Sequence, residues 1–139
     1  MTWDEFDSEM RKLANTINYR PDIVVGIARG GVIPAALLAK YLGVKDMFVL
    51  KLERDTPGRK ISALAMKPVE HRKILLVEDM IETGRSLMVG KKFLEERGAE
   101  VKTACLYTMP ISEMTPDYFL REIAEVALFP WNKALDHAA

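Results

Sequence analysis

The sequence predicts a single α/β domain with a mostly parallel central sheet flanked by helices. Its 139 residues suffice for one domain and leave no room for a second full domain. Short apolar runs rich in Val and Ile read as strands buried on both faces, which is typical of parallel sheets. Segments with helical spacing alternate with these runs, and this alternation favours parallel strands joined by right-handed crossovers.

The chain begins with a predicted helix and a predicted strand. Residues 4–18 place apolar side chains at helical spacing, and Thr2 or Asp4 can cap the start of this helix. Pro21 then stops any helix. Residues 23–27 form a short β-branched run that predicts a buried strand.

A second helix and a second strand are expected to follow. The helix covers residues 32–41, with Pro34 in its first turn and Gly43 where a C-terminal glycine belongs. Residues 46–52 predict the strand. The next segment, residues 53–73, is rich in basic residues and contains Pro and Gly breakers, so we expect a mobile basic loop.

The second half of the chain repeats the order of strand, loop and helix. Residues 74–77 predict the third strand, and the helix that follows the next loop ends at Gly98. Residues 101–108 predict a fourth strand, and residues 126–129 predict a short fifth strand. Between them, residues 110–117 are polar and turn-rich.

Composition argues against several classes of protein. The 20 Lys and Arg residues balance the 20 Asp and Glu residues, which argues against a nucleic-acid binder. Residues 1–10 carry acids and no apolar run, so they do not resemble a signal peptide, and we expect a cytoplasmic protein. The longest apolar stretch, residues 32–39, is interrupted by Pro34 and too short to cross a bilayer, so no membrane association is expected. The single Cys105 reads as a buried structural thiol.

Polar loops follow the predicted strands, and they are expected to share one crevice. In an open parallel sheet, ligands bind beyond the carboxyl ends of the strands, which here means residues 28–31, 78–86 and 108–110. Residues 83–86, Thr-Gly-Arg-Ser, open a helix, where free N–H groups and the helix dipole attract an anion. Gly84 lets a phosphate approach the backbone. The alternative is an ordinary helix cap made by a Thr or Ser hydroxyl.

Two adjacent carboxylates, Glu78 and Asp79, end the third strand and repel each other unless a positive or hydroxyl-rich group joins them. A vicinal diol, Mg²⁺ or both would serve, and the alternative is a solvated acidic turn. Together with the phosphate loop, the pair describes a pocket for a phosphorylated sugar. Glu82, which lies between the two features, is placed to exchange a proton with the other half of the ligand.

Residues 74–86 resemble the phosphoribosyl-pyrophosphate signature of type I phosphoribosyltransferases. Purine-specific members look most similar because they put an acid before Thr-Gly, although the family usually has Asp where this chain has Glu82. The resemblance implies the type I phosphoribosyltransferase fold and Mg²⁺, held by Glu78 and Asp79 mainly through ribose hydroxyls or water. It also implies substrate contacts from the whole loop, namely Glu78, Asp79, Met80, Ile81, Glu82, Thr83, Gly84, Arg85 and Ser86.

Residues 24–34 are similar to the pyrophosphate loop of the same family. Arg29 and Gly30 fall on its characteristic pair, whose peptide is often cis and whose N–H groups face the diphosphate. A guanidinium followed by Gly30 and Gly31 also suits a dianion on chemical grounds. A dinucleotide-binding turn is the competing interpretation, but these glycines do not form G-x-G-x-x-G.

Residues 127–131 look like the nucleobase-binding hood of bacterial and archaeal xanthine-guanine and hypoxanthine enzymes, a hood expected mainly from residues 110–139. Phe129 and Trp131 place aromatic rings close to the purine, and the alternative is that both are core or dimer residues. Met109 stands where 6-oxopurine relatives usually carry a Lys that donates to the purine, and Asn132 stands where relatives often carry an acid. These departures bear on the choice of base.

The resemblance implies a purine phosphoribosyltransferase that uses phosphoribosyl pyrophosphate and a purine, with Glu82 and Arg29 as catalytic residues. Met109 would contact the base, and relatives generally form homodimers or homotetramers. One alternative is a non-catalytic regulator that senses phosphoribosyl pyrophosphate or a nucleotide in the same pocket. Another is transfer to adenine or to a pyrimidine.

Overall fold

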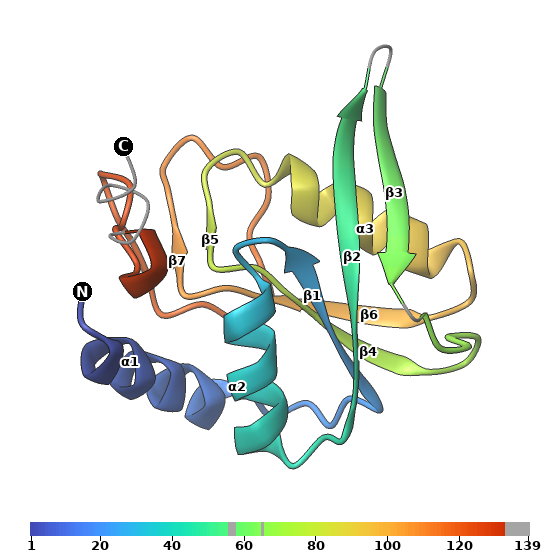
Figure 1. The fold of residues 1–139 in the computed structure, drawn as a ribbon, viewed down its shortest axis with the longest axis horizontal. Helices are drawn as coiled ribbons and strands as arrows, with labels where there is room; N and C mark the ends of the chain where they lie inside the picture. Colours follow the sequence, from blue (N-terminus) through green and yellow to red (C-terminus); the bar gives the residue numbers. More distant parts are fainter. Residues whose placement is uncertain (56–57, 65, 133–139) are drawn as a thin grey trace.

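The computed structural model describes residues 1–55, 58–64 and 66–132, and at its centre lies a five-stranded sheet in the order β3-β2-β1-β4-β6. Strands β1, β2, β4 and β6 run parallel to their neighbours, whereas β3 is antiparallel to β2 (Figure 1). The sheet consists of β1 (Ile23–Ala28), β2 (Asp46–Asp55), β3 (Gly58–Leu64), β4 (Lys73–Val77) and β6 (Glu100–Ala104).

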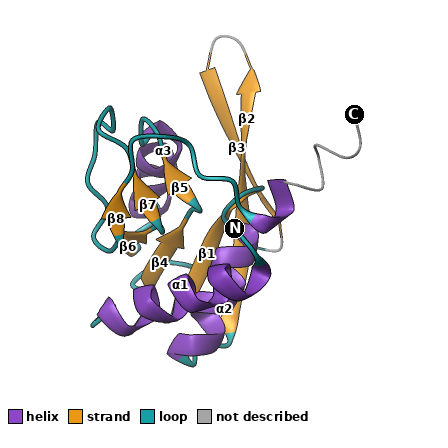
Figure 2. Ribbon diagram, turned by 90° about the vertical axis from the view of Figure 1, so that its left-hand side faces the viewer, coloured by secondary structure: helices purple, strands orange, loops and turns teal. Residues whose placement is uncertain are grey.

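Helices cover both faces of this sheet. On one face, α1 (Trp3–Thr16) and α2 (Val32–Leu42) pack with Val24 of β1, and on the other, α3 (Arg85–Glu95) packs with Val25 (Figure 2). The alternation of side chains along β1 therefore serves two apolar cores. This confirms the predicted α/β domain with a parallel sheet buried on both faces. In the described part of the chain, every helix falls short of the length and apolarity of a membrane span.

Local signals in the sequence fix the ends of the first two helices. The Thr2 hydroxyl accepts a hydrogen bond from the Glu5 N–H at 3.1 Å, and the Glu5 side chain accepts one from the Thr2 N–H, which completes a capping box. Gly43 ends α2 in the left-handed conformation, with φ of 72°. Both features were predicted, with Thr2 rather than Asp4 as the cap.

The prediction of a loop over residues 53–73 is wrong for most of its first half. β2 continues to Asp55, and β3 returns antiparallel to it, so that the two strands form a hairpin extending beyond the rest of the sheet (Figure 1). Leu52 faces Ile61 across this pair, and both pack against the core. This apolar pairing favours strands on both sides of the Pro57-Gly58 signal, of which Gly58 begins β3 and Pro57 lies outside the described residues.

A second, three-stranded parallel sheet lies at the carboxyl end of the first and corrects two further predictions. Its order is β5 (Met80–Ile81), β7 (Tyr107–Thr108), β8 (Arg121–Glu122). The strand predicted over residues 101–108 is divided into β6 and β7, because the Leu106 N–H turns to the Asp79 carbonyl. Residues 126–129 form no strand, because the Phe129 N–H donates to the Asn132 side chain instead.

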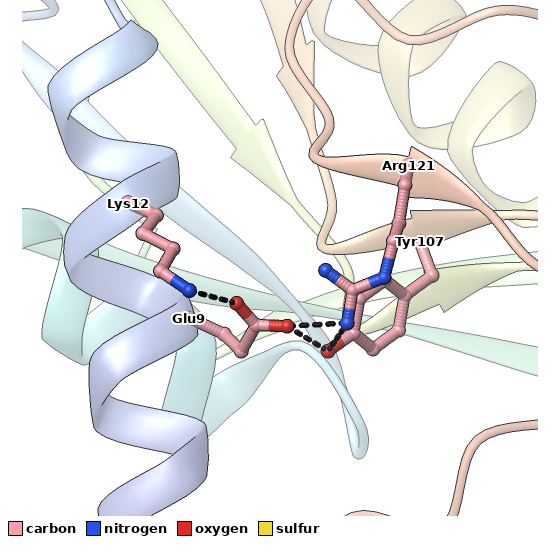
Figure 3. A network of polar contacts seen from close by, with 4 residues as sticks. All are labelled: Glu9, Lys12, Tyr107 and Arg121. Atoms are coloured by element: carbon pink, nitrogen blue, oxygen red, sulfur yellow. Dashed lines mark hydrogen bonds and ion pairs between the residues drawn. The ribbon is translucent and has the colours of Figure 1, made fainter.

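A buried polar network ties this small sheet to α1. The Glu9 carboxylate accepts hydrogen bonds from the Tyr107 hydroxyl at 2.9 Å and from Arg121, while Lys12 forms an ion pair with its other oxygen at 3.4 Å (Figure 3). Burial by itself raises the pKa of Glu9, but the hydrogen bonds from Arg121 and Tyr107 outweigh it, so the pKa lies below its ordinary value. The network therefore requires the ionised carboxylate.

Glu9→Gln tests this requirement. We expect the free energy of unfolding at pH 7 to fall by about 1–2 kcal/mol, because a neutral amide accepts weaker hydrogen bonds than a carboxylate. A lowered native pKa gives stability that is present above the unfolded value of 4.5 and lost as the pH falls through the native pKa. Urea unfolding at pH 7 and at about pH 3 should therefore show the difference from wild type shrinking in acid.

Glu95→Gln, at an exposed position on α3, is the control and should change stability by less than about 0.5 kcal/mol. A difference between Glu9→Gln and wild type that is the same at both pH values would contradict the assignment.

Candidate active site

The strand order places a crevice between the carboxyl ends of β1 and β4. The chain leaves β1 to form β2 on one side, whereas β4 lies on the other side, so the loops after β1 and β4 diverge at this point. They meet where a Cβ atom added to Gly30 would lie 2.4 Å from the Asp79 carboxylate. The structure thus brings together the predicted pyrophosphate loop and the predicted acidic pair.

A cavity of about 640 Å³ opens beside this junction, within the usual size of small-molecule sites. One wall is the continuous stretch predicted from the signature, and the other comes from the C-terminal segment. The lining residues are Glu78, Asp79, Met80, Ile81, Glu82, Thr83, Gly84, Arg85, Ser86, Val126, Ala127, Phe129 and Asn132.

The acidic pair lies at the base of this cavity. Burial raises the pKa of Asp79, against the opposing effect of the Met80 N–H, which donates to its carboxylate at 2.6 Å. Glu78 is half-buried, and its N–H donates to the Ala104 carbonyl. Within the described ranges, no three His, Cys, Asp or Glu side chains gather closely enough to hold a metal by themselves. Two carboxylates in one cavity fit Mg²⁺ that takes its remaining ligands from substrate and water.

Gly84 begins α3 without any side-chain capping hydrogen bond, with φ of 85°. The Thr83 hydroxyl accepts only a long bond of 3.3 Å from the Arg85 N–H. The alternative of an ordinary Thr or Ser helix cap is therefore not what the structure shows. Backbone N–H groups at the start of α3 lie where an anion in the cavity would meet them, together with the positive end of the helix dipole.

The turn-rich segment 110–117 contacts the loop of residues 83–86, and the sequence did not predict these contacts. The Glu113 N–H donates to the Thr83 carbonyl at 2.8 Å, and its carboxylate pairs with Arg85 at 3.2 Å. Met114 packs so closely that a Cβ on Gly84 would lie 2.7 Å from it. No local pattern signals these contacts, because the ion pair joins residues that are 28 positions apart.

The pyrophosphate loop differs from expectation in one detail. The cis peptide joins Ala28 to Arg29, so the expectation of a cis bond between Arg29 and Gly30 is wrong by one residue. Arg29 is exposed at the carboxyl end of β1, and Gly31 is buried against the Val77 carbonyl. Arg29 and Gly31 do not line the cavity. Gly30, which lies between them, is adjacent to the side chain of the lining residue Asp79.

The predicted base-binding residues occupy different places. Phe129 lines the cavity, but its ring is only 1% exposed and stacks on Trp131 at 4.9 Å and on Tyr107 at 6.0 Å. Trp131 lies outside the lining and packs edge to face on Phe6 at 5.0 Å. Met109 also lies outside the lining, and its N–H donates to the Ile81 carbonyl. Phe129, Trp131 and Tyr107 therefore pack on one another beside the cavity, and only Phe129 lines it.

Three residues that were not chosen as substrate contacts do line the cavity, namely Val126, Ala127 and Asn132. Val126 is exposed and Ala127 is half-buried, whereas Phe129 is buried. The sequence could have indicated these three residues only because they lie close to the predicted base-binding residues Phe129 and Trp131. An apolar residue at the surface of a cavity is not distinguishable from a core residue by its type alone.

Comparison with known proteins agrees with this geometry. The profile of the phosphoribosyl transferase domain matches residues 3–137. The chain belongs to this family. It is 30% identical to a xanthine-guanine phosphoribosyltransferase of Chromohalobacter salexigens, over 95% of this chain and 82% of that protein. It is 27% identical to the enzyme of that name from Gluconobacter oxydans, over 96% of this chain and 84% of that protein.

Solved structures show the same phosphoribosyltransferase fold. A purine phosphoribosyltransferase from Pyrococcus horikoshii is 31% identical, with a TM-score of 0.84 over 94% of this chain and 91% of that one. A xanthine-guanine-hypoxanthine phosphoribosyltransferase from Helicobacter pylori has a TM-score of 0.84 at 22% identity, over 99% of this chain and 95% of that one. The predicted family and fold are thereby confirmed.

Gly84→Ala, compared with Gly43→Ala, tests the phosphate loop. Both positions have positive φ, so each substitution should cost about 1–2 kcal/mol of stability. Nothing lies within 4 Å of a Cβ on Gly43, whereas a Cβ on Gly84 meets Met114. We expect only Gly84→Ala to displace the loop and to weaken calorimetric binding of ribose 5-phosphate, by about tenfold or more. Equal affinity in the two variants would argue against phosphate binding at this loop.

Proposed function

We propose that this protein transfers the 5-phosphoribosyl group from phosphoribosyl pyrophosphate to a purine base, a 6-oxopurine by preference, in purine salvage. A base nitrogen forms a bond to the ribosyl C1′ while the bond from C1′ to the pyrophosphate oxygen breaks. The electron pair leaves with pyrophosphate, and the proton of the base nitrogen is released. The observation that carries the proposal is one cavity that joins the whole of residues 78–86 to Val126, Ala127, Phe129 and Asn132.

The sugar and its phosphate would be bound by the signature wall. Glu78 and Asp79 would accept hydrogen bonds from the ribose hydroxyls, a role supported by the Met80 N–H, which holds the Asp79 carboxylate in the cavity lining. The 5′-phosphate would lie at residues 83–86, where the N-terminus of α3 opens into the cavity.

The diphosphate would lie over the loop of Arg29, Gly30 and Gly31. Arg29 places an exposed guanidinium at the carboxyl end of β1, suited to the charge that develops on the leaving group. Mg²⁺, when bound with substrate, would supply further positive charge to the pyrophosphate oxygens. Glu78 and Asp79 would hold this ion mainly through ribose hydroxyls or water.

Glu82 would accept the proton released by the base. It lines the cavity between the acidic pair and the phosphate loop, and it is exposed to whatever occupies the cavity. The base itself would lie against Val126 and Ala127, with Phe129 behind them. We further propose that Met109, Phe129 and Trp131 support the pocket for the base. We also propose that the protein forms a homodimer or homotetramer and lies in the cytoplasm.

The first experiment is pyrophosphate release from phosphoribosyl pyrophosphate and Mg²⁺, with guanine, hypoxanthine, xanthine, adenine, uracil and orotate in parallel. We expect release with one or more 6-oxopurines. Calorimetric binding of phosphoribosyl pyrophosphate without release for any base would instead favour the regulator, which uses the same pocket without turnover.

Glu82→Gln isolates the proton transfer. Because the amide cannot accept the proton, kcat should fall by about 10²–10⁴ while the Kd of phosphoribosyl pyrophosphate stays within about threefold. Glu82→Asp keeps the carboxylate and is the matched control, expected to retain most of the activity. Equal losses of turnover and of phosphoribosyl-pyrophosphate affinity in Glu82→Gln would remove Glu82 from this role.

A further inference from the structure

The side-chain amide of Asn132 has a fixed orientation. The Phe129 N–H donates to its Oδ1 at 2.9 Å, and the Asn132 N–H donates to the Phe129 carbonyl at 3.0 Å. Because a backbone N–H only donates, the atom that faces it must be the amide oxygen and not the amide nitrogen. Chemistry therefore assigns the two ends of this amide, which are otherwise hard to distinguish.

The amide nitrogen is the end left for a ligand. It carries two N–H donors, and among the residues that the structure describes no hydrogen bond engages them. Asn132 is half-buried and lines the cavity. A group that is half-buried in a ligand cavity gains most when the ligand supplies the missing acceptor.

The rest of this wall offers no competing side-chain donor. Val126 and Ala127 are apolar, the Phe129 ring is buried, and the Phe129 N–H is already donated to Asn132. Met109 has no donor and lies outside the lining. Across the cavity, Met80 and Ile81 are apolar and the three carboxylates are acceptors. The cationic and hydroxyl groups of that wall belong to residues 83–86.

We propose that Asn132 determines base specificity by donating from its amide nitrogen to a carbonyl oxygen of the base. This inference rests on the proposed function and names its substrate more narrowly. An oxygen at the contacted position accepts the hydrogen bond, whereas an exocyclic amine there places donor against donor and leaves both unpaired. Xanthine carries oxygens at both C2 and C6, guanine has an amine at C2, and adenine has an amine at C6. At C2, this donor favours xanthine over guanine, whereas at C6 it favours the 6-oxopurines, xanthine included, over adenine.

Asn132→Asp separates this role from the structural one. The carboxylate still accepts the Phe129 N–H, but it presents an acceptor where the amide presents a donor. Asn132→Ser is the second variant, since a serine hydroxyl is too short to replace the amide in the cavity. Asn18→Asp makes the same chemical change where the amide oxygen accepts from the Tyr118 hydroxyl, outside the cavity lining, and serves as the matched control.

The experiment measures kcat/KM for xanthine, guanine and adenine, and the calorimetric Kd of xanthosine, guanosine and adenosine monophosphates. In Asn132→Asp, we expect the preference for xanthine over guanine or over adenine to fall by about tenfold or more, with the midpoint of thermal unfolding close to wild type. A fall relative to guanine identifies C2 as the contacted position, whereas a fall relative to adenine with an unchanged ratio of xanthine to guanine identifies C6. Asn18→Asp should leave every ratio unchanged.

Unchanged ratios in both Asn132 variants would overturn the inference, as would a wild-type protein that binds xanthosine monophosphate no better than adenosine monophosphate. The binding data keep this outcome distinct from a failure of the proposed function. If no base releases pyrophosphate, the transferase proposal fails, whereas the ranking of the nucleotides still tests Asn132.

Discussion

The close approach of Gly30 to Asp79 is the contact on which the site depends. An added Cβ atom on Gly30 would lie 2.4 Å from the Asp79 carboxylate and would displace that side chain. One on Gly31 would lie 2.3 Å from the Val77 carbonyl, so this position admits only glycine without a shift of the backbone. The backbone after β1 therefore lies directly against the end of β4. That contact sets the distance between the groups proposed to bind the diphosphate and those proposed to bind the ribose.

The small sheet extends this arrangement to the opposite wall. β5 belongs to the signature loop, and β7 pairs with it in parallel, so Tyr107 is held at a set distance from the cavity. Its hydroxyl donates to Glu9 of α1, its ring stacks on Phe129, and burial beside Glu9 raises its pKa to about 12. The N-terminal helix and the cavity wall are thereby connected through one buried side chain.

The two walls differ in chemistry in a way that suits a ligand with distinct ends. The signature wall carries two carboxylates at its start and backbone N–H groups with Arg85 at its end, and Glu113 holds that arginine from outside. The C-terminal wall is apolar except for Asn132. A ligand with a phosphate, a diol and a flat heterocycle matches this order of surfaces, since each part meets a group of complementary polarity.

The sequence by itself determined the helices, the strands of the parallel core and the stretch 78–86, because each depends on neighbours within a few residues. Capping at Thr2, the left-handed Gly43 and the buried run of β4 are local signals of this kind. A contiguous loop at the end of a strand enters the site as a unit, so its residues were found together. The pairing of β7 with β8, the burial of Phe129 and the contact of Glu113 with Arg85 became apparent in the folded chain alone. These features depend on packing and hydrogen bonds between segments whose relative positions the fold sets, and no local pattern encodes which distant partner a side chain will meet.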